Sequence, residues 1–545
     1  MADPNSGSYL AARHASNAND FAASARFFTK SLIADPTDPY LLENAMTAFI
    51  ALGQVDRAIP VAQVMVDNGY QSQIAHLTLS LQAAKTGQWD QIFAALEQGR
   101  SVAPLVDGIA QAWAHLGEGD MTKALASFDQ VIETPNMTVY GMTHKAYALA
   151  SVGDFEGAEA IFNGAATGNV LRYSTRSATA RAQILSQLGR NEDALAIIDG
   201  VFGKQLDPRV AELRAELAAG TAVAFDAVRT PAEGMAEMFQ VIAGIVQGDA
   251  PDAYTVLYAR AAAYLDPDNT PAILMAAQLL DDMGQYDLAN DAYASISRTN
   301  PAFHAAELGR ADVLSDAGRE DAAIEVLEAL ARSHPDLPQV HATKGDTLRQ
   351  AERYDEATAA YTRALDLYDD ASPVKWFVHY TRGITNHLLD NWAAAESDFR
   401  AALALNPDHP QVLNYLGYSL VERGEKLDEA LTMIETAAAA RPDNGAIIDS
   451  LGWVLFQLGR YDEAVGYLET AAELLPVDPV INDHLGDVYW AVGREVEAHF
   501  QWHRALSFDP DAEDAGRIRD KISRGLDLVL RDEGLDPIRV ARGND

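Results

Sequence analysis

Between Gln411 and Pro510, hydrophobic and polar residues follow the same pattern three times in succession. In each copy the apolar residues recur at three- and four-residue spacing, break at a short turn and then resume, which predicts a pair of helices. Each copy also carries a Leu-Gly pair in its first helix, an alanine in its second and a proline at its end. Equivalent markers lie 34 or 35 residues apart, so the unit is a repeat. The markers are Leu416-Gly417, Leu451-Gly452 and Leu485-Gly486; Ala430, Ala464 and Ala498; and Pro442, Pro476 and Pro510.

Helix packing explains these marker residues. We expect the glycine and the alanine to lie where the two helices cross most closely, since a larger side chain would push the axes apart. The proline ends the second helix because it has no N–H to continue the hydrogen-bond ladder. A large residue stands four positions after each alanine, as at Phe399, Leu468 and Trp502, and is expected to fill the contact with the next unit. A period of about 34 residues with such markers is that of the tetratricopeptide repeat, which the chain therefore resembles.

The same unit extends, less regularly, over most of the chain. Residues 1–209 predict looser repeats, in which several closing prolines are missing or displaced, whereas residues 271–510 predict regular repeats. Between them, residues 210–270 show the weakest pattern. They predict either a divergent repeat or a joint between two superhelical halves, with the joint favoured. Methionines at helical spacing in this segment are more typical of core than of a binding surface.

The pattern changes after Pro510. In the segment that follows, Ile518, Ile522 and Leu526 lie on one helical face, with basic residues nearby. A terminal repeat would expose its apolar face to water, so residues 511–545 are expected to supply an amphipathic capping helix and a tail. The sequence thus predicts an all-α fold: a right-handed superhelical solenoid of about 14 tetratricopeptide-like helix hairpins with a C-terminal capping helix.

The charge balance of the chain limits the classes of partner that we expect. The 545 residues include 79 Asp and Glu against 41 Lys and Arg, a formal net charge of −38. Such a surface repels nucleic-acid phosphates and anionic lipids, so we expect protein partners and no nucleic acid. No run of 18 apolar residues is present, so no transmembrane segment is expected. The chain has no cysteine, which excludes disulfides and cysteine-ligated metals.

The inner wall of the predicted solenoid is the expected binding site. Stacked hairpins place their first helices on this concave side, where residues outside the helix-packing set can meet a ligand. A short polar group recurs there at Asn414, Asp449 and Asp483, as a ladder that can hold the backbone amides of an extended peptide. The alternative is that these groups bridge neighbouring helices and that the aromatic residues are partly buried packing. The full candidate set is Tyr380, His387, Asn414, Tyr418, Asp449, Trp453, Phe456, Asp483, Asp487 and Trp490.

Signals of catalysis are missing from the sequence. It contains no glycine-rich phosphate loop, nucleophile elbow or His-Glu-x-x-His motif, and its 13 histidines are scattered. We therefore expect no catalytic residue, no metal and no cofactor. A receptor for a C-terminal carboxylate would need Lys, Arg and Asn on the inner helices, where acidic and aromatic residues stand instead. The sequence predicts a noncatalytic protein-binding adaptor or scaffold.

The three C-terminal units resemble a more particular group, the large tetratricopeptide lipoproteins of proteobacterial envelopes. They are most similar to the family of the lipoprotein that partners the periplasmic C-terminal processing protease. This resemblance implies a noncatalytic adaptor that binds the protease and presents peptidoglycan hydrolases to it. One departure is that the N-terminal cysteine that would carry a lipid is missing. The resemblance extends from about Pro271 to Pro510 and is carried by Asn414-Tyr415-Leu416-Gly417-Tyr418, Ile448-Asp449-Ser450-Leu451-Gly452-Trp453 and Asn482-Asp483-His484-Leu485-Gly486-Asp487.

The resemblance also implies a location. The abrupt polar start at Met1-Ala2-Asp3-Pro4-Asn5 looks like a mature exported domain whose signal peptide has been removed. We therefore expect a periplasmic protein, with association with the outer membrane left open and the cytoplasm as the alternative. A general scaffold for another envelope or cytosolic assembly is the alternative function. Whether the solenoid forms a homo-oligomer also stays open.

Overall fold

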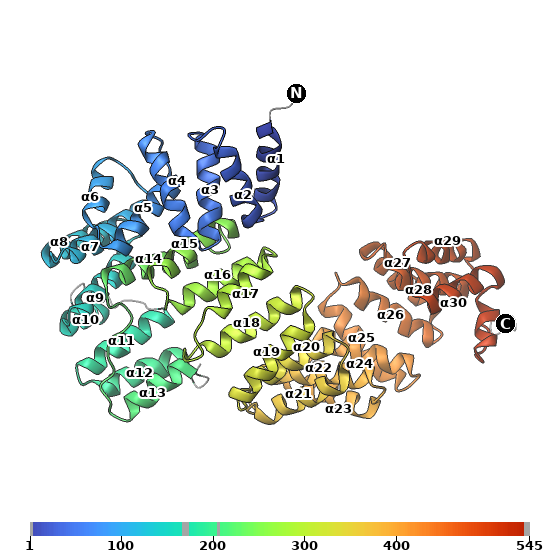
Figure 1. The fold of residues 1–545 in the computed structure, drawn as a ribbon. Helices are drawn as coiled ribbons and strands as arrows, with labels where there is room; N and C mark the ends of the chain where they lie inside the picture. Colours follow the sequence, from blue (N-terminus) through green and yellow to red (C-terminus); the bar gives the residue numbers. More distant parts are fainter. Residues whose placement is uncertain (1–3, 166–173, 204–205, 207, 539–545) are drawn as a thin grey trace. The chain divides into compact units, whose positions relative to one another are not determined.

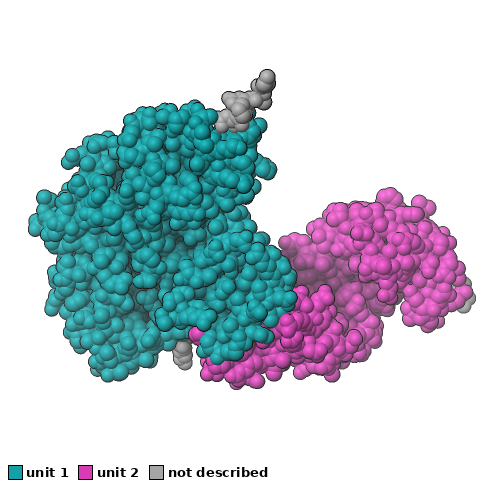
Figure 2. Space-filling model, in the orientation of Figure 1, with its two compact units in different colours: residues 1–333 teal, residues 334–545 magenta. Residues whose placement is uncertain are grey.

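The computed structural model describes residues 4–165, 174–203, 206 and 208–538 (Figure 1). In this part of the chain the regular elements are 31 helices, and no β-strand is present. The helices divide between two units, residues 1–333 and residues 334–545, each with its own hydrophobic core (Figure 2). The predicted all-α repeat fold is confirmed.

In its described residues, unit 1 is a run of helical hairpins, and α13 packs on α12 without a second helix of its own. Its helices are α1 (Pro4–Asn17), α2 (Phe21–Leu32), α3 (Pro39–Ala51), α4 (Val55–Asp67), α5 (Gln73–Thr86), α6 (Asp90–Glu97), α7 (Pro104–Gly117), α8 (Met121–Glu133), α9 (Thr138–Ser151), α10 (Phe155–Phe162), α11 (Thr175–Gln187), α12 (Asn191–Phe202), α13 (Pro208–Ala218), α14 (Pro231–Val246), α15 (Asp252–Leu265), α16 (Thr270–Asp282), α17 (Tyr286–Ala294), α18 (Phe303–Asp316) and α19 (Glu320–Ser333).

Unit 2 also consists of hairpins and ends with two further helices, of which only the last is short. Its helices are α20 (Pro338–Gln350), α21 (Tyr354–Leu367), α22 (Lys375–Leu388), α23 (Trp392–Leu405), α24 (Pro410–Glu422), α25 (Leu427–Ala440), α26 (Gly445–Gln457), α27 (Tyr461–Leu474), α28 (Pro479–Ala491), α29 (Glu495–Leu506), α30 (Ala512–Arg524) and α31 (Leu526–Asp532).

Polar caps and glycines fix where many of these helices begin and end. Asp38, Ser72 and Asp478 each accept hydrogen bonds from backbone N–H groups of the helix that follows. Those N–H groups would otherwise lack a partner in the first turn. In the turns of the last two hairpins, Gly459 and Gly493 adopt φ values of +75° and +85°, a left-handed conformation that favours glycine. The second helix therefore turns back directly against the first.

The marker glycines lie at the helix crossings, as the sequence predicts. A Cβ atom on Gly486 would lie 2.4 Å from Cδ1 of Trp502, in the same hairpin. Trp502 thus fills the gap that the glycine leaves in its own hairpin, a contact that the sequence did not predict. Phe399 covers Gly383 in the same way, and its ring centroid also lies 5.0 Å from that of Tyr415 in the next hairpin, as expected.

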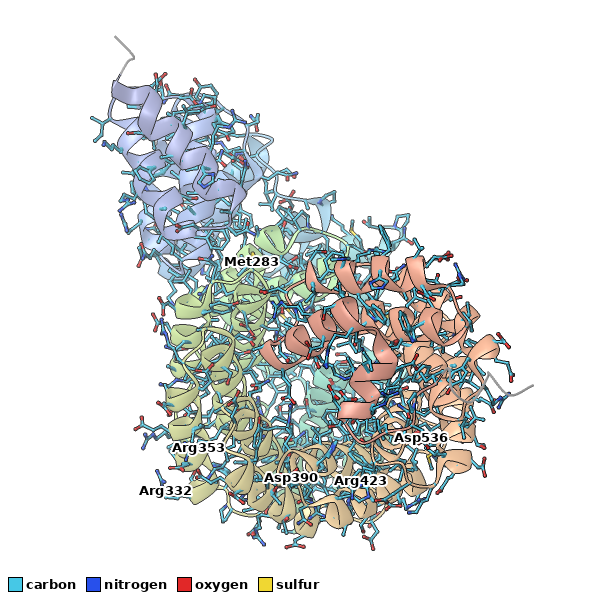
Figure 3. All side chains as sticks on the ribbon, turned by 90° about the vertical axis from the view of Figure 1, so that its right-hand side faces the viewer. Met283, Arg332, Arg353, Asp390, Arg423 and Asp536 are labelled. Atoms are coloured by element: carbon cyan, nitrogen blue, oxygen red, sulfur yellow. The ribbon has the colours of Figure 1, made fainter. Side chains whose placement is uncertain are left out.

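Successive hairpins of unit 2 stack with their first helices on the inner side. The first helices α20 and α22, α24 and α26, and α26 and α28 contact one another, more extensively than successive second helices do. A stack whose first helices lie closer together curves toward them. In Figure 3 the turns of three successive hairpins, marked by Arg353, Asp390 and Arg423, follow one edge of this unit.

In unit 1 the helices α14 and α15 depart from the order of the repeats. Together they contact α3, α5, α7 and α9, which are first helices of the N-terminal hairpins (Figure 1). Of these four helices, α14 packs most on α7, and α15 packs most on α3. Residues 210–270, for which the sequence predicts a divergent repeat or a joint, thus contain an internal hairpin that covers the inner side of the N-terminal repeats.

This internal hairpin is held by buried apolar side chains and by polar bonds at its edge. Met235, Met238 and Phe239 of α14 are almost completely buried, and burying each contributes about 1.5–3 kcal/mol. Arg260 of α15 donates from Nε to the carbonyl oxygen of Ala51 at 3.2 Å, at the C-terminal end of α3, where a cation is favoured. The inner side of the N-terminal repeats is therefore occupied by the chain itself.

At the C-terminal end of unit 2, α30 and α31 cover the last hairpin. Ile518 and Leu526 are buried there, so the predicted capping helix is confirmed. The apolar stripe is divided between two helices, because the chain turns at Gly525 with φ +83°. A Cβ atom at this position would lie 2.6 Å from Cη2 of Trp490, so both the backbone and the contact require glycine.

Candidate functional site

The predicted site residues all lie on first helices of unit 2. Tyr380 and His387 belong to α22 and Asn414 and Tyr418 to α24, while the remaining six are divided between α26 and α28. The structure separates this inner face into a C-terminal part that the chain itself covers and a more open part on α22 and α24.

The carboxylates on α28 are covered by the capping helices. Lys521 of α30 is fully buried and donates to Asp483 Oδ2 at 2.7 Å and to Asp487 Oδ2 at 2.8 Å. Asp487 also accepts a hydrogen bond from the indole N–H of Trp502 at 2.9 Å. Burial raises the pKa of Asp487, and Lys521 offsets part of that rise. Both carboxylates are thus engaged within the chain.

Trp490 is covered in the same way. Its indole N–H donates to Asp527 Oδ2 of α31 at 3.2 Å, and its ring lies against Gly525. Only 9% of its surface is exposed. A peptide would reach this ring only after α31 had moved away.

Asp449, Trp453 and Phe456 take part in a bridge between α26 and α28. His484 Nδ1 lies 3.0 Å from both carboxylate oxygens of Asp449. The ring of Trp453 stacks on that of His484, with centroids 3.9 Å apart, and on that of Phe456, at 4.8 Å. Burial alone would lower the pKa of His484, but the nearby carboxylates, Asp449 foremost, outweigh it and raise that pKa. At Asp449 the alternative interpretation, a bridge between neighbouring helices, describes the structure.

The open part of the inner face is an aromatic cluster. The rings of Tyr380 and Tyr415 meet edge to face with centroids 6.1 Å apart, and the Tyr415 hydroxyl lies 3.2 Å from Nδ1 of His387. Phe377 lies 6.4 Å from the Tyr380 ring, between centroids, and keeps 45% of its surface exposed. Tyr380, Tyr415 and Tyr418 are partly exposed. Burial raises the pKa of all three, that of Tyr415 to about 12, so each keeps its hydroxyl proton at neutral pH.

Asn414 adds an amide whose hydrogen-bonding capacity is unused. Its Oδ1 atom is buried and has no hydrogen-bond partner among the described residues. A buried acceptor without a partner costs about 1–3 kcal/mol, which an N–H group of a ligand would recover. Of the three rungs of the predicted ladder, Asp449 contacts His484 through both carboxylate oxygens. Asp483 accepts from Lys521 through Oδ2, while its Oδ1, like the Oδ1 of Asn414, is buried without a partner among the described residues.

The sequence prediction missed the contact between α28 and α30. Asp483 and Asp487 stand one helical turn apart, and so do Arg517 and Lys521, so two acidic groups face two basic groups at matching spacing. Arg517 Nη1 lies 3.9 Å from Asp483 and 3.8 Å from Asp487. This match of charge and spacing could have predicted the contact between the two helices from the sequence. Phe377, which extends the aromatic cluster, was also missed.

The side chains of the inner face suit contact with a peptide more than chemistry on a substrate. In the described residues no group of three or more His, Asp or Glu side chains is placed to hold a metal ion. No helix in the same residues is long and apolar enough to span a bilayer. What the inner face offers is aromatic surface, tyrosine hydroxyls and an unpaired amide oxygen, which are groups that contact peptides.

Comparison with known families identifies the repeats. Models of the tetratricopeptide repeat match residues 282–346, 338–370, 389–444 and 419–479. The chain is therefore a protein with tetratricopeptide repeats, and its fold is a solenoid of that type. Such repeats indicate a protein-binding scaffold.

Individual proteins resemble the chain at low identity or over short stretches. A TPR repeat-containing protein of Pseudomonas aeruginosa is 37% identical over 81 residues, which is 15% of this chain and 14% of that protein. Among solved structures, a chain of the APC/C hetero-tetramer Cut9-Hcn1 is 14% identical over 96% of both chains, with a TM-score of 0.39. YrrB, described as a TPR protein with an unusual peptide-binding site, is 18% identical over 39% of this chain and 100% of its own, with a TM-score of 0.30.

Proposed function

We propose that the chain is a noncatalytic adaptor that binds peptide segments of partner proteins on the open inner face of α22 and α24. The observation that carries this proposal is the aromatic cluster of Phe377, Tyr380 and Tyr415. Helix α24, which carries Tyr415, adds the partly exposed Tyr418 and the unpaired acceptor of Asn414. A peptide across these helices would gain apolar contact from the rings and would donate an N–H group to Asn414.

The setting proposed for this adaptor is the bacterial envelope. It rests on the resemblance of the three C-terminal repeats to the lipoprotein family named above. In this role the protein is periplasmic, binds a C-terminal processing protease and presents peptidoglycan hydrolases to it. The net charge of −38 favours partners with neutral or basic surfaces. The alternative is a scaffold for another envelope or cytosolic assembly that uses the same inner face.

A pull-down from the native envelope fraction, with partners identified by mass spectrometry, tests the proposal. We expect the chain to recover a serine protease or cell-wall hydrolases, and a Phe377→Ser/Tyr418→Ser variant to lose them while its circular dichroism is unchanged. Tyr467→Ser is the matched control, because Tyr467 lies on the second helix α27 and is 42% exposed.

Two results would count against the proposal in different ways. Recovery of ribosomal or other cytosolic proteins alone would end the envelope role. Retention of the same protease or hydrolases by the double variant would end the assignment of the inner face.

A further inference from the structure

Unit 1 contains a cavity of about 660 Å³. It is lined by residues of α11, α13 and α14 and by the loops that precede α14 and α16. Ligand pockets have volumes of about 300–1,000 Å³, so this cavity is large enough for a short peptide segment. None of the residues predicted from the sequence as a binding site belongs to it.

Two side-chain amides on the cavity wall have unused hydrogen-bonding capacity. Asn269 is 2% exposed, and its Oδ1 accepts from the backbone N–H of Ala272 at 3.2 Å, which caps α16. Its Nδ2 has no partner among the described residues, and neither has the buried Oε1 of Gln240 on α14. The cavity lining thus includes an unpaired donor and an unpaired acceptor. These are the complements of the C=O and N–H groups of a peptide backbone.

Five carboxylate side chains line the same cavity: Glu212 and Glu216 of α13, and Asp226, Asp266 and Asp268 of the loops. In the described part of the chain, none of Asp226, Asp266 and Asp268 forms an ion pair within 4.0 Å. Burial raises the pKa of Asp266; the negative charges of Glu233 and Asp268 add to that rise, while Arg229 and a backbone N–H lower it. A positively charged group placed among these carboxylates would therefore be attracted.

Three arginines also line the cavity, Arg176, Arg209 and Arg229, and two of them pair with glutamates. Arg176 pairs with Glu237 at 2.5 Å, and Arg229 pairs with Glu233 at 3.1 Å. Glu233 and Glu237 are not part of the wall, so the ion pairs of Arg176 and Arg229 are made with groups outside the cavity. The five carboxylates outnumber the three arginines of the wall, so the net charge that a ligand meets there is negative.

From these features we propose that the cavity is a second peptide site, which receives a segment with a lysine or arginine side chain. Asn269 and Gln240 bind the peptide backbone, and the basic side chain lies among Asp226, Asp266 and Asp268. This inference rests on the proposed function because the chain binds peptides in both. It concerns unit 1, whereas the pull-down variants lie in unit 2, so either result can fail without the other.

The absence of cysteine allows a direct binding test on the full chain. Thr175 lines the cavity and is exposed, so Thr175→Cys carries one environment-sensitive dye at the site. The probe is an acetylated and amidated Gly-Ser octapeptide with a central Lys-Arg pair, compared with the same peptide carrying Glu-Glu. We expect a saturable change in fluorescence with the basic peptide and none with the acidic one.

Variants distinguish binding in the cavity from the nonspecific attraction of a basic peptide to an acidic protein surface. Asn269→Ser keeps the helix cap but removes the Nδ2 donor, and should raise the half-saturating peptide concentration about tenfold. Asp226→Asn/Asp266→Asn should raise it by at least about tenfold. Asp35→Asn, at an exposed position after α2, should leave it unchanged. An equal response to both peptides, or equal effects of Asp35→Asn and the site variants, would overturn the proposal.

Discussion

Lys521 Nζ has no exposed surface and lies 2.8 Å from Oδ2 of Asp487. Asp487 belongs to α28, the first helix of the last hairpin. The same ammonium group lies 2.7 Å from Asp483. These two carboxylates are where the sequence predicts a peptide ligand, and the chain meets them with its own basic helix. Helix α30 of the same chain therefore covers the C-terminal end of the inner face.

Replacing Lys521 with methionine should destabilise unit 2. The substitution keeps the length of the side chain but leaves Asp487 buried without its nearest cation, and breaking a buried ion pair costs about 3–5 kcal/mol. Because Arg517 remains 3.8 Å from Asp487, we expect the lower end of that range. Urea denaturation followed by tryptophan fluorescence measures the loss.

Arg524→Met is the control for this variant. Arg524 also lies on α30 and forms ion pairs with Asp520 and Asp532, but all three side chains are at least 40% exposed. Exposed ion pairs contribute up to about 1 kcal/mol. Equal losses for Lys521→Met and Arg524→Met would show that the buried pair has no special role.

The bridge between Asp449 and His484 should make the stability of unit 2 depend on pH. Asp449, Asp483 and Asp487 face His484 and raise its pKa in the folded state, while Lys521 neutralises part of the charge of the last two. A histidine with a raised folded pKa contributes stability that is fully present below its unfolded pKa of about 6.5. That contribution is lost as the pH rises through the folded pKa.

The pH dependence can be measured as the free energy of unfolding between about pH 5.5 and 8.5. The wild-type chain should lose stability from this source as the pH rises, and His484→Gln should show a smaller loss. His503→Gln, at an exposed position on α29, should follow the wild type. If His484→Gln keeps the wild-type slope, the bridge is not its source.

Trp490→Ala should destabilise the capping helices before it affects any ligand. The ring is buried against Gly525, and the indole N–H donates to Asp527. Removing a buried tryptophan side chain costs about 3–5 kcal/mol. Hydrogen exchange at residues 526–532 should become faster in this variant, whereas Tyr467→Ala should leave it unchanged. Unchanged exchange in Trp490→Ala would show that the ring does not hold α31 in place.

Local pattern was sufficient to predict the hairpins. The glycine, alanine and proline markers act within one unit, and Gly486 meets Trp502 only 16 residues away. The break at Gly525 was missed because an apolar stripe with one glycine also fits a continuous helix. What shows the break is the contact of Gly525 with Trp490, which lies in a different hairpin.

Contacts between distant segments were not predictable from periodicity. Asp449, Asp483 and Asn414 occupy the same place in their repeats, and the sequence therefore treats them alike. Their surroundings differ because His484 reaches Asp449 and Lys521 reaches Asp483, while the Oδ1 of Asn414 has no partner among the described residues. The position of each side chain on its helix followed from the repeat, but which of them stays open depends on the neighbouring helix.

The packing of the internal hairpin on the N-terminal repeats was not predictable from the repeat period, and Gly234 offers a sharp test of it. A Cβ atom on Gly234 of α14 would lie 2.2 Å from Cε2 of the fully buried Trp113 on α7. Gly234→Ala should therefore force α14 and α7 apart and destabilise unit 1 by about 1–3 kcal/mol, measured by urea denaturation. Gly244→Ala is the control in the same helix, because nothing lies within 4 Å of its Cβ position. Alanine there should be neutral or stabilise α14 by up to about 1 kcal/mol, since alanine has the higher helix propensity. Equal effects of the two substitutions would contradict the close packing of α14 on α7.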